Sequence, residues 1–540
     1  MTARASIRPY LNQAYLLGLL MVAVGLTLSP FLMGMSQFWL AAVWLIDGIV
    51  AKDFKDKFSR FWHNKAAVLL VAFYLMHVIG LLWTSDFQYA LKDLRVKLPI
   101  LVMPFVLSSM EPLDRKRFDL VMLIYVVSVF IATQFSFVSY LKHDYEDVRE
   151  ISHFISHIRF CLNIVFSMAL VGYYIFKKRI TKGNGVPAFQ VRYAVDQFLM
   201  WFLMFWFTYV IFIFESLSGY VILGAVALVS AIYAFLQWKK SRGWNLAVGV
   251  AVLAALVVGI AVVAHFVKPM LKVEPVDFTA LEKKTALGND YWHDTICNPV
   301  EDGKYVGLYY CRKELQEVWP QRSDLPLEGT TLNGESLEAT LARYLTSKDL
   351  RKDAQGVMAL TDEDVRNIEQ GVANYNNWKH PGMHARLSST LFEYNLYRRF
   401  NNPNGGSLSQ RLEYTRASFH IIGQHPWFGV GTGDVPQAFA QTYDEIHSPL
   451  KEEYRFRAHN QYLAIAVAFG LVGLAFFLFV LFYPRFSSKQ HRTYLYMVFL
   501  CIMLLSMFPE DTLETQAGAT LFAFFVSILL FAKKPLSLHQ

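Results

Sequence analysis

The sequence lacks the signatures of several common protein classes. No internal repeat recurs at the periods of solenoid proteins, and no glycine-rich phosphate loop is present. The 15 histidines are scattered rather than paired at the spacings of metal ligands. No small-x-small cleavage pattern follows the first apolar run, and a second run begins almost at once. We therefore expect a retained anchor there rather than a cleaved signal peptide.

Apolar residues, by contrast, are abundant. Hydrophobic residues make up 54% of the 540 positions and the mean hydropathy is +0.29, which is more than one soluble core of this size needs to bury. Runs near the length that crosses a bilayer, about 17–25 residues, predict an all-α polytopic membrane protein of about twelve helices. These runs lie at residues 13–31, 34–50, 66–84, 97–110, 118–140, 160–176, 196–215, 217–236, 245–266, 462–483, 493–508 and 517–532.

The loops between these runs carry lysine and arginine unequally. One alternating set of loops holds 23 such residues, and the short loops of the other set hold six. Because cytoplasmic loops retain positive charge during insertion, we expect both termini in the cytoplasm and residues 267–457 outside, in the periplasm beside a bacterial inner membrane. Topology accounts for most of the net charge of +8, so we expect no nucleic-acid partner.

This topology predicts three parts of the chain. Residues 1–266 are a membrane domain of about nine spans, 267–457 a large periplasmic loop domain, and 458–540 a C-terminal membrane domain of about three spans. Cys161 and Cys501 fall inside predicted spans, where they are expected to be packing residues. Cys297 and Cys311 lie in the loop, where oxidation is permitted, and we expect a disulfide between them.

Two helices are predicted in the second half of the loop. Residues 385–400 place apolar side chains at near-helical spacing beside arginines, which indicates an amphipathic helix on the membrane surface or against the loop itself. After a break at 401–406, Ser407 or Ser409 can cap a helix that runs to about Ile422. Residues 267–380 contain no sequence pattern that indicates a particular reaction or ligand.

The predicted topology gathers polar residues from distant parts of the chain at the outer ends of the spans. They are Arg95, Lys97, His157, Arg159, residues 215–218, Arg411, Arg416, His459, Glu510, Asp511 and Glu514. Ionisable groups are costly to hold in partly apolar surroundings, so several on one face favour a site over coincidence. Taken singly, however, each of these residues could equally be an anchor at a helix end or a hydrogen-bonded side chain at the membrane interface.

Arg411, Arg416 and His459 fit the chemistry of a pyrophosphate-leaving reaction. A planar guanidinium makes bidentate, charge-assisted bonds to phosphate oxygens and stays protonated. The two arginines are five residues apart, roughly 140° around a helix, so both face one ligand only if that ligand is extended. His459 begins the helix predicted at 460–483, and the positive end of that helix is expected to keep its imidazole neutral and available as a base.

Residues 405–483 resemble the O-antigen ligase and polymerase superfamily. Four motifs carry the resemblance in a fixed order: RLEY at 411–414, HPWFGVGTGD at 425–434, HNQYL at 459–463 and GLVGL at 470–474. The resemblance extends to the whole chain by topology, since these proteins look like GT-C-type membrane glycosyltransferases with twelve helices and a large late periplasmic loop. It implies transfer of a glycan from undecaprenyl pyrophosphate to an acceptor hydroxyl, without a nucleotide sugar, a cofactor or a metal.

The resemblance also assigns roles to single residues. His459 matches the periplasmic histidine that activates or orients the acceptor, and Arg411 matches the arginine that binds the donor phosphates. A further family arginine is replaced here by the sequence ESLSGY at 215–220, which leaves one phosphate ligand unaccounted for. The candidates for binding the donor pyrophosphate beside Arg411 are Arg416, Arg95, Lys97 and Arg159.

Supporting residues are expected around this pair. The glycines of the 425–434 motif are expected to form a tight turn whose amides are open to an anionic or sugar ligand. Asp434 then orients a sugar hydroxyl or caps the segment after it, and an acidic residue at 510 or 511 pairs with Arg411 or His459. The supporting candidates are Asn460, Asp434, Glu510, Asp511 and Glu514.

Several functions share this pattern. A ligase, which we prefer, attaches the finished glycan to lipid A core, a polymerase joins repeat units, and a protein O-oligosaccharyltransferase uses a Ser, Thr or Tyr acceptor. A transporter of the lipid-linked glycan belongs to a different class and would place charged or broken helices near the bilayer midplane. The central parts of most predicted spans are apolar, which favours an enzyme. A loop that only binds envelope partners would leave His459 and Arg411 dispensable.

Overall fold

The computed structural model describes residues 2–142, 151–180, 187–214, 216–237, 272–404, 406–484 and 494–531, with isolated positions between 250 and 268. Within these residues the regular secondary structure is helical apart from one two-stranded sheet. It divides into two compact units. The first comprises Met1–Gly249, Tyr414–Ile446 and Arg455–Gln540, and the second comprises Val250–Glu413 and His447–Tyr454.

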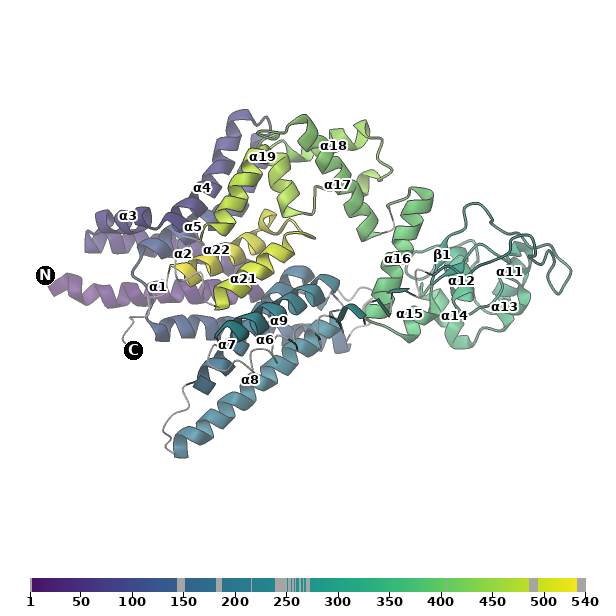
Figure 1. The fold of residues 1–540 in the computed structure, drawn as a ribbon, viewed down its shortest axis with the longest axis horizontal. Helices are drawn as coiled ribbons and strands as arrows, with labels where there is room; N and C mark the ends of the chain where they lie inside the picture. The colour runs from purple at the N-terminus through teal and green to yellow at the C-terminus, as the bar shows by residue number, and fades with distance from the viewer. Residues whose placement is uncertain are drawn as a thin grey trace. The chain divides into compact units, whose positions relative to one another are not determined.

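The first unit is built from long apolar helices (Figure 1). Its elements are α1 (Thr2–Leu28), α2 (Pro30–Ala51), α3 (Phe54–His63), α4 (Lys65–Ile79), η1 (Gly80–Trp83), α5 (Phe87–Ser109), α6 (Arg115–Lys142), α7 (His157–Ile180), α8 (Pro187–Ile213), α9 (Leu217–Gln237), α18 (Val435–Glu445), α19 (Gln461–Phe482), α21 (Tyr494–Ser506), η6 (Thr512–Glu514) and α22 (Gln516–Leu530). Most of α17 (Ser407–Gln424) belongs to it as well.

Seven helices among the described residues are long and apolar enough to cross a membrane. They are Ile7–Leu28, Pro30–Ala51, Lys65–Trp83, Arg115–Lys142, His157–Ile175, Asp196–Ile213 and Gln461–Phe482. Three shorter apolar helices, at Leu217–Tyr233, Tyr494–Ser506 and Gln516–Leu530, coincide with three more of the predicted runs. The run at 97–110 is the second half of α5, and the run at 245–266 lies largely outside the described residues. The polytopic character is confirmed, and the number of spans stays a prediction.

Helix α5 occupies the middle of the helical unit, in contact with α4, α22, α3 and α2. It begins ten residues before the predicted apolar run because the Asp86 side chain accepts from the Tyr89 amide at 2.9 Å and caps the helix. Charged residues therefore enter the packed interior on its first turns. A second centre of packing lies where the rings of Tyr125 and Phe166 contact that of Phe525, with centroids 4.7 and 4.6 Å away.

The second unit contains short helices around its own apolar core. Its elements are β1 (Val300–Glu301), β2 (Lys304–Tyr305), α11 (Arg312–Val318), η3 (Trp319–Gln321), α12 (Leu337–Ser347), α13 (Ala354–Met358), α14 (Asp362–Glu369), α15 (Tyr375–Lys379), α16 (Met383–Phe400) and η4 (Glu452–Tyr454). Trp319, Leu341, Tyr344 and Ile368 are fully buried at the centre of that core.

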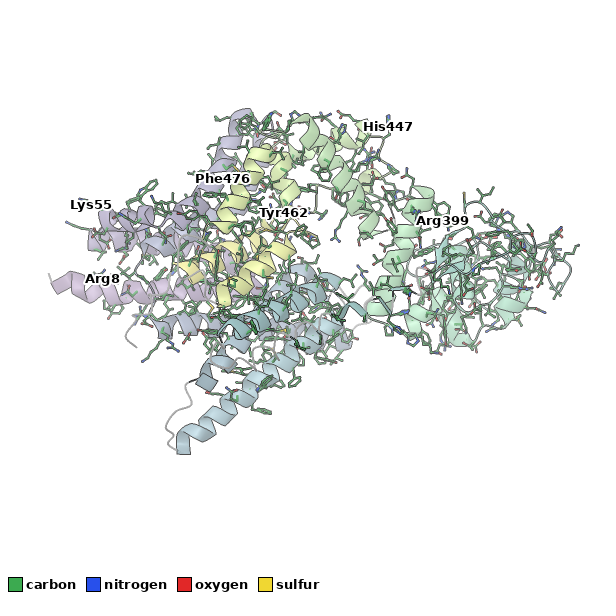
Figure 2. The ribbon with its side chains drawn as sticks, in the orientation of Figure 1. Arg8, Lys55, Arg399, His447, Tyr462 and Phe476 are labelled. Carbon is green, nitrogen blue, oxygen red and sulfur yellow. The ribbon has the colours of Figure 1, made fainter. Side chains whose placement is uncertain are left out.

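Helix α16 corresponds to the helix predicted at 385–400. It packs against the rest of the second unit, which was one of the two predicted arrangements. It contacts β1, and the guanidinium of Arg343 lies 4.2 Å from the ring centroid of Phe392 on α16. Arg399, near the end of the helix (Figure 2), donates to the carbonyl of Asn298. Arg343 also makes a bidentate ion pair with the buried Glu301, with both N–O distances 2.8 Å.

The predicted disulfide between Cys297 and Cys311 is wrong. Both thiols are free, Cys297 on the surface and Cys311 in the interior. The Cys311 amide bonds to the carbonyl of Lys352 at 2.8 Å and fixes its segment inside the unit, whereas Cys297 lies in a turn in which its amide donates to Asp294 at 2.8 Å. The two cysteines belong to different local structures, which their sequence spacing does not reveal.

Candidate active site

His459 lies immediately before the cap of α19. The helix begins at Gln461, and Asn460 is its N-cap, with its side-chain oxygen accepting from the Leu463 amide at 3.0 Å. The Asn460 amide group also donates to the carbonyl of Phe508 at 2.9 Å. His459 was expected to begin the helix but lies two residues before its first residue, in a left-handed conformation with φ 44°. Such a backbone is uncommon for a residue other than glycine and is a pointer to function.

The His459 ring lies between two aromatic side chains, and one of its nitrogens is left without a hydrogen bond among the described residues. Its centroid is 5.4 Å from that of Tyr414 at an interplanar angle of 33°, and 6.2 Å from that of Phe456. Its Nδ1 is buried and makes no hydrogen bond within the described part of the chain. Ligand atoms of His459, Glu510 and Asp511 all lie within 4.8 Å of one another. A partly buried imidazole therefore stands beside two carboxyl groups, the usual setting of an acid–base residue.

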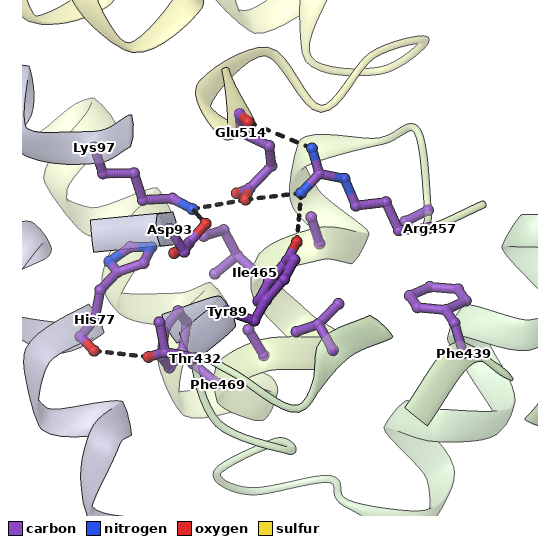
Figure 3. A pocket seen from close by; sticks show the side chains of 14 residues that line it. His77, Tyr89, Asp93, Lys97, Thr432, Phe439, Arg457, Ile465, Phe469 and Glu514 are labelled. Atoms are coloured by element: carbon purple, nitrogen blue, oxygen red, sulfur yellow. Dashed lines mark hydrogen bonds and ion pairs between the residues drawn. The ribbon is translucent and has the colours of Figure 1, made fainter. Parts of the chain in front are cut away.

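Arg457, two residues before His459, connects this group to the interior of the helical unit (Figure 3). Its Nε lies 2.8 Å from an Asp511 oxygen, although the N–H does not point at that oxygen. One terminal nitrogen is 3.5 Å from Glu514 and donates to the Tyr89 hydroxyl at 3.1 Å. Sequence reasoning missed Arg457. The available signal was an arginine beside the histidine motif, at the same predicted outer boundary as the acidic residues.

The buried charges continue from Arg457 through Glu514 to Lys97. The Lys97 ammonium is 2.6 Å from Glu514 and 2.5 Å from Asp93, and Gln461 donates to Glu514 at 3.0 Å. Burial raises the pKa of Glu514, but the charges of Lys97 and Arg457 outweigh that effect and hold the pKa below its ordinary value. The residues thus form a chain of alternating charges that ties α5, α19 and η6 together.

The cavity around these charges is nearly filled. It is lined by Tyr89, Asp93, Lys97, Arg457 and Glu514 together with His77 and apolar residues of α18 and α19, as Figure 3 shows. Its free volume is ≈ 20 Å³, which is room for about one water molecule. Lys97, whose side chain is 2% exposed, therefore lies beside two carboxylates in a space too small for a pyrophosphate.

The 425–434 motif closes a break in α19. Gly470 interrupts that helix with φ 65°, and the carbonyls of Val467 and Ala468 accept from the amides of Val430 and Gly431 at 3.0 and 2.9 Å. Glycine is required because a Cβ on Gly470 would lie 2.3 Å from the Trp427 backbone. The motif amides were expected to face a ligand. They bond instead to protein carbonyls, which satisfies the broken helix inside the unit.

Asp434, at the end of the same motif, fixes the segment that precedes α5. Its carboxylate accepts from the Ser85 amide at 2.9 Å and from the Asp86 amide at 2.8 Å. Thr432 donates to the His77 carbonyl at 2.7 Å, and the Gly433 amide donates to Thr84 at 3.0 Å. The predicted capping of the segment after Asp434 is not seen, because its side chain makes no capping bond to α18 and instead binds the amides of residues 85 and 86.

The O-antigen ligase family model matches residues 371–478. The segment is thus similar to the O-antigen ligase family, and we call residues 371–478 the O-antigen ligase domain below. The superfamily resemblance of the four motifs is confirmed, and the domain also contains Arg457. No curated protein matches the chain.

Within the O-antigen ligase domain, the two predicted phosphate-binding arginines lie on α17. Arg411 is partly buried and falls in the part of the helix that belongs to the second unit, one turn before Tyr414. Arg416 is exposed and falls in the first unit. Tyr414, whose ring contacts that of His459, is buried.

The remaining candidates lie outside the O-antigen ligase domain. Arg95 is exposed on α5. Arg159 is partly buried at the start of α7, where it donates to Ser156 at 2.8 Å and lies within electrostatic range of Glu510 and Asp511. Glu215, in the stretch that departs from the family pattern, lies outside the described residues. Arg159 is thus the predicted cation that the structure brings toward the carboxyl pair near His459.

Proposed function

We propose that the chain is a glycosyltransferase that moves a glycan from undecaprenyl pyrophosphate to an acceptor hydroxyl, with lipid A core as the preferred acceptor. The reaction takes place at the periplasmic face of the inner membrane. The observation that carries the proposal is His459, a partly buried and conformationally strained histidine beside two carboxyl groups, inside the O-antigen ligase domain.

In the proposed reaction His459 acts as the general base. The acceptor oxygen forms a bond to the anomeric carbon while the bond from that carbon to the donor phosphate oxygen breaks, and its electron pair leaves with the pyrophosphate. His459 takes the hydroxyl proton, and the carboxyl groups of Glu510 and Asp511 stabilise the resulting imidazolium. Direct displacement of this kind inverts the anomeric centre.

Arg411 is proposed to bind the departing pyrophosphate, as in the family that it resembles. A planar guanidinium stabilises the charge that develops on two phosphate oxygens at once. Arg416, Arg95 and Arg159 remain proposed donor ligands of second rank. The contacts of Lys97 with Asp93 and Glu514 favour a structural role for that residue.

Arg411→Lys is expected to lower kcat/KM for the lipid-linked donor about 10- to 100-fold, because lysine keeps the charge but loses the bidentate geometry, worth about 1.5–3 kcal/mol. Arg398→Lys is the matched control, since Arg398 is an exposed arginine of the same family segment on α16. Initial rates over a range of donor concentrations measure the effect. An Arg411→Lys enzyme with the kcat/KM of the Arg398→Lys enzyme would remove Arg411 from the donor site.

Chelation of divalent cations is expected to leave the transfer rate unchanged. The donor atoms of His459, Glu510 and Asp511 are close enough to hold a cation, but the Arg457 guanidinium 2.8 Å from Asp511 repels one. Rates are compared before and after treatment with a chelator and again after Mg²⁺ or Mn²⁺ is restored. A loss that either metal reverses would make this group a metal site and contradict the metal-independent mechanism.

The acceptor is tested by supplying each candidate separately to the purified, reconstituted protein. Lipid A core, a second carrier-linked repeat unit and a Ser- or Thr-containing peptide are offered with the same lipid-linked donor. The proposal expects glycan on lipid A core. Elongated carrier-linked glycan would instead identify a polymerase, and glycosylated peptide a protein O-oligosaccharyltransferase.

A transporter of the lipid-linked glycan is the alternative from a different class, and the break in α19 at Gly470 is the feature that favours it. The break, however, is closed by residues 426–431. The charged cavity beside it has room for about one water molecule. These contacts support an enzyme whose broken helix holds a rigid turn.

A further inference from the structure

A second cleft lies at the other end of the helices that carry the candidate active site. Its volume is ≈ 540 Å³, and it is lined by the first residues of α4 and by the last residues of α5, α19 and α22. The charged cavity near His459 is lined by residues nearer the opposite ends of α4, α5 and α19 and by Glu514 of η6, which directly precedes α22. Helix α4 alone spans about 22 Å between the two. The cleft is therefore separate from the proposed transfer reaction.

The polar lining of this cleft is basic. Arg60, His63 and Lys65 line it, and no acidic residue is among the described residues that do. Lys65 is exposed and makes no ion pair within the described part of the chain. His63 is also exposed, and its Nδ1 donates to the carbonyl of Ser59 at 2.7 Å, so its Nε2 is left for another partner. Arg60 lies 3.7 Å from Asp53 and is partly neutralised.

Neighbouring cations of the same unit are balanced differently. Arg8 pairs with Glu111 at 2.7 Å, and the buried Lys57 pairs with Asp47 at 2.7 Å. Lys55 and Lys116 form no ion pair among the described residues, but they are exposed and do not line this cleft. Lys65 is thus set apart, because an ammonium group without an ion-pair partner among the described residues lies on a concave surface.

Apart from the neutral polar residues Asn64 and Ser108, the rest of the lining is apolar or aromatic and includes Tyr483, Leu530 and Phe531. Helix α3, which leads into the cleft, exposes Phe58 and Trp62 on one side, as helices at a membrane–water interface do. The C-terminal ends of α5, α19 and α22, whose free carbonyls carry partial negative charge, disfavour an anion here. Arg60 covers one of them, since its Nε donates to the Ser109 carbonyl at 2.6 Å.

We propose that this cleft binds the phosphodiester headgroup of an anionic membrane phospholipid, with Lys65 on the phosphate and Phe531 and Leu530 against the upper part of an acyl chain. His63 adds a second donor to the phosphate from Nε2 when its ring is an imidazolium. Basic pockets between membrane helices are suited to such headgroups. In the proposed topology the cleft opens to the cytoplasmic leaflet. A free phosphate ion offers the same charge but no acyl chain to cover the apolar lining.

The test is lipid retention by the purified full-length protein, measured by native mass spectrometry with phosphatidylglycerol or phosphatidylcholine added to the micelles. Wild type is expected to retain phosphatidylglycerol in preference to phosphatidylcholine. Lys65→Gln lowers that preference about five-fold, and adding His63→Gln lowers it further. Lys55→Gln is the matched control, because Lys55 points away from the helices at the start of α3 (Figure 2) and is expected to change nothing.

Three results would overturn the proposal. Equal losses in Lys65→Gln and Lys55→Gln would mean that the preference reflects overall charge. Equal retention of the two lipids would leave an apolar groove without headgroup recognition. Displacement of phosphatidylglycerol by millimolar inorganic phosphate would identify a soluble anion as the occupant. None of these readouts depends on glycan transfer, so failure here leaves the proposed function standing.

Discussion

Replacing His459 by alanine is expected to lower the rate of glycan transfer about 10²–10⁴-fold, the usual contribution of a general base. The loss belongs in kcat, because the imidazole acts on the proton that leaves in the transition state. The variant should remain folded, since the side chain is only partly buried and its Nδ1 makes no hydrogen bond within the described part of the chain. Single-turnover rates in proteoliposomes measure the change.

His447→Ala is the matched control for this variant. His447 is also a histidine with a left-handed backbone, φ 49°, but it is exposed (Figure 2). Relief of backbone strain alone would affect both variants similarly, whereas loss of the base affects only the first. Transfer by a folded His459→Ala protein at the rate of His447→Ala would contradict the assigned base.

Lys97→Met is expected to destabilise the protein by about 3–5 kcal/mol, because it leaves the buried Asp93 carboxylate without its cation and Glu514 with only the more distant Arg457. Lys92→Met removes an exposed lysine from the same helix and should stay within about 0.5 kcal/mol of wild type. Denaturant titrations of both variants in the same detergent give the difference.

The same two variants separate a structural role of Lys97 from donor binding. A structural lysine changes stability, and any activity of the folded fraction keeps the donor KM of wild type. A Lys97→Met protein with wild-type stability and a raised donor KM would instead show that Lys97 binds the donor phosphates. That result would require the nearly filled cavity around it to open in the presence of donor.

The sequence predicted the helices well because the signal for a membrane span is local. An apolar run such as 462–483 has few alternatives to a helix in lipid, and α19 matches it to within one residue at either end. The break at Gly470 was not predicted, since a glycine in an apolar helix is common. The break is required by residues 426–431, about forty positions earlier in the chain.

The candidate site was predicted in part. The motifs identified His459 and placed Glu510 and Asp511 near it, and the structure brings the three together. Glu514 and Lys97 were taken as residues facing a ligand, but they contact each other because α5 and η6 are adjacent. Pairing between segments more than four hundred residues apart leaves no trace in spacing or periodicity. For the same reason Arg457, which joins both groups, was overlooked.

The left-handed backbone of His459 shows how these contacts serve the proposed chemistry. Asn460 binds the helix start and the Phe508 carbonyl, and Arg457 binds Asp511 and Glu514 on the other side. His459 stands between two residues that are each fixed to the 507–514 segment. The base is therefore held rigidly beside Glu510 and Asp511 before any substrate arrives.

The most direct test of the central claim is to count products in proteoliposomes that contain only the purified protein, lipid-linked glycan and lipid A core. The account predicts one undecaprenyl pyrophosphate released for each glycan attached to lipid A core, with the anomeric configuration inverted and both products lost in His459→Ala. Movement of intact lipid-linked glycan between the leaflets without release of pyrophosphate would show that the chain is a transporter and contradict the account.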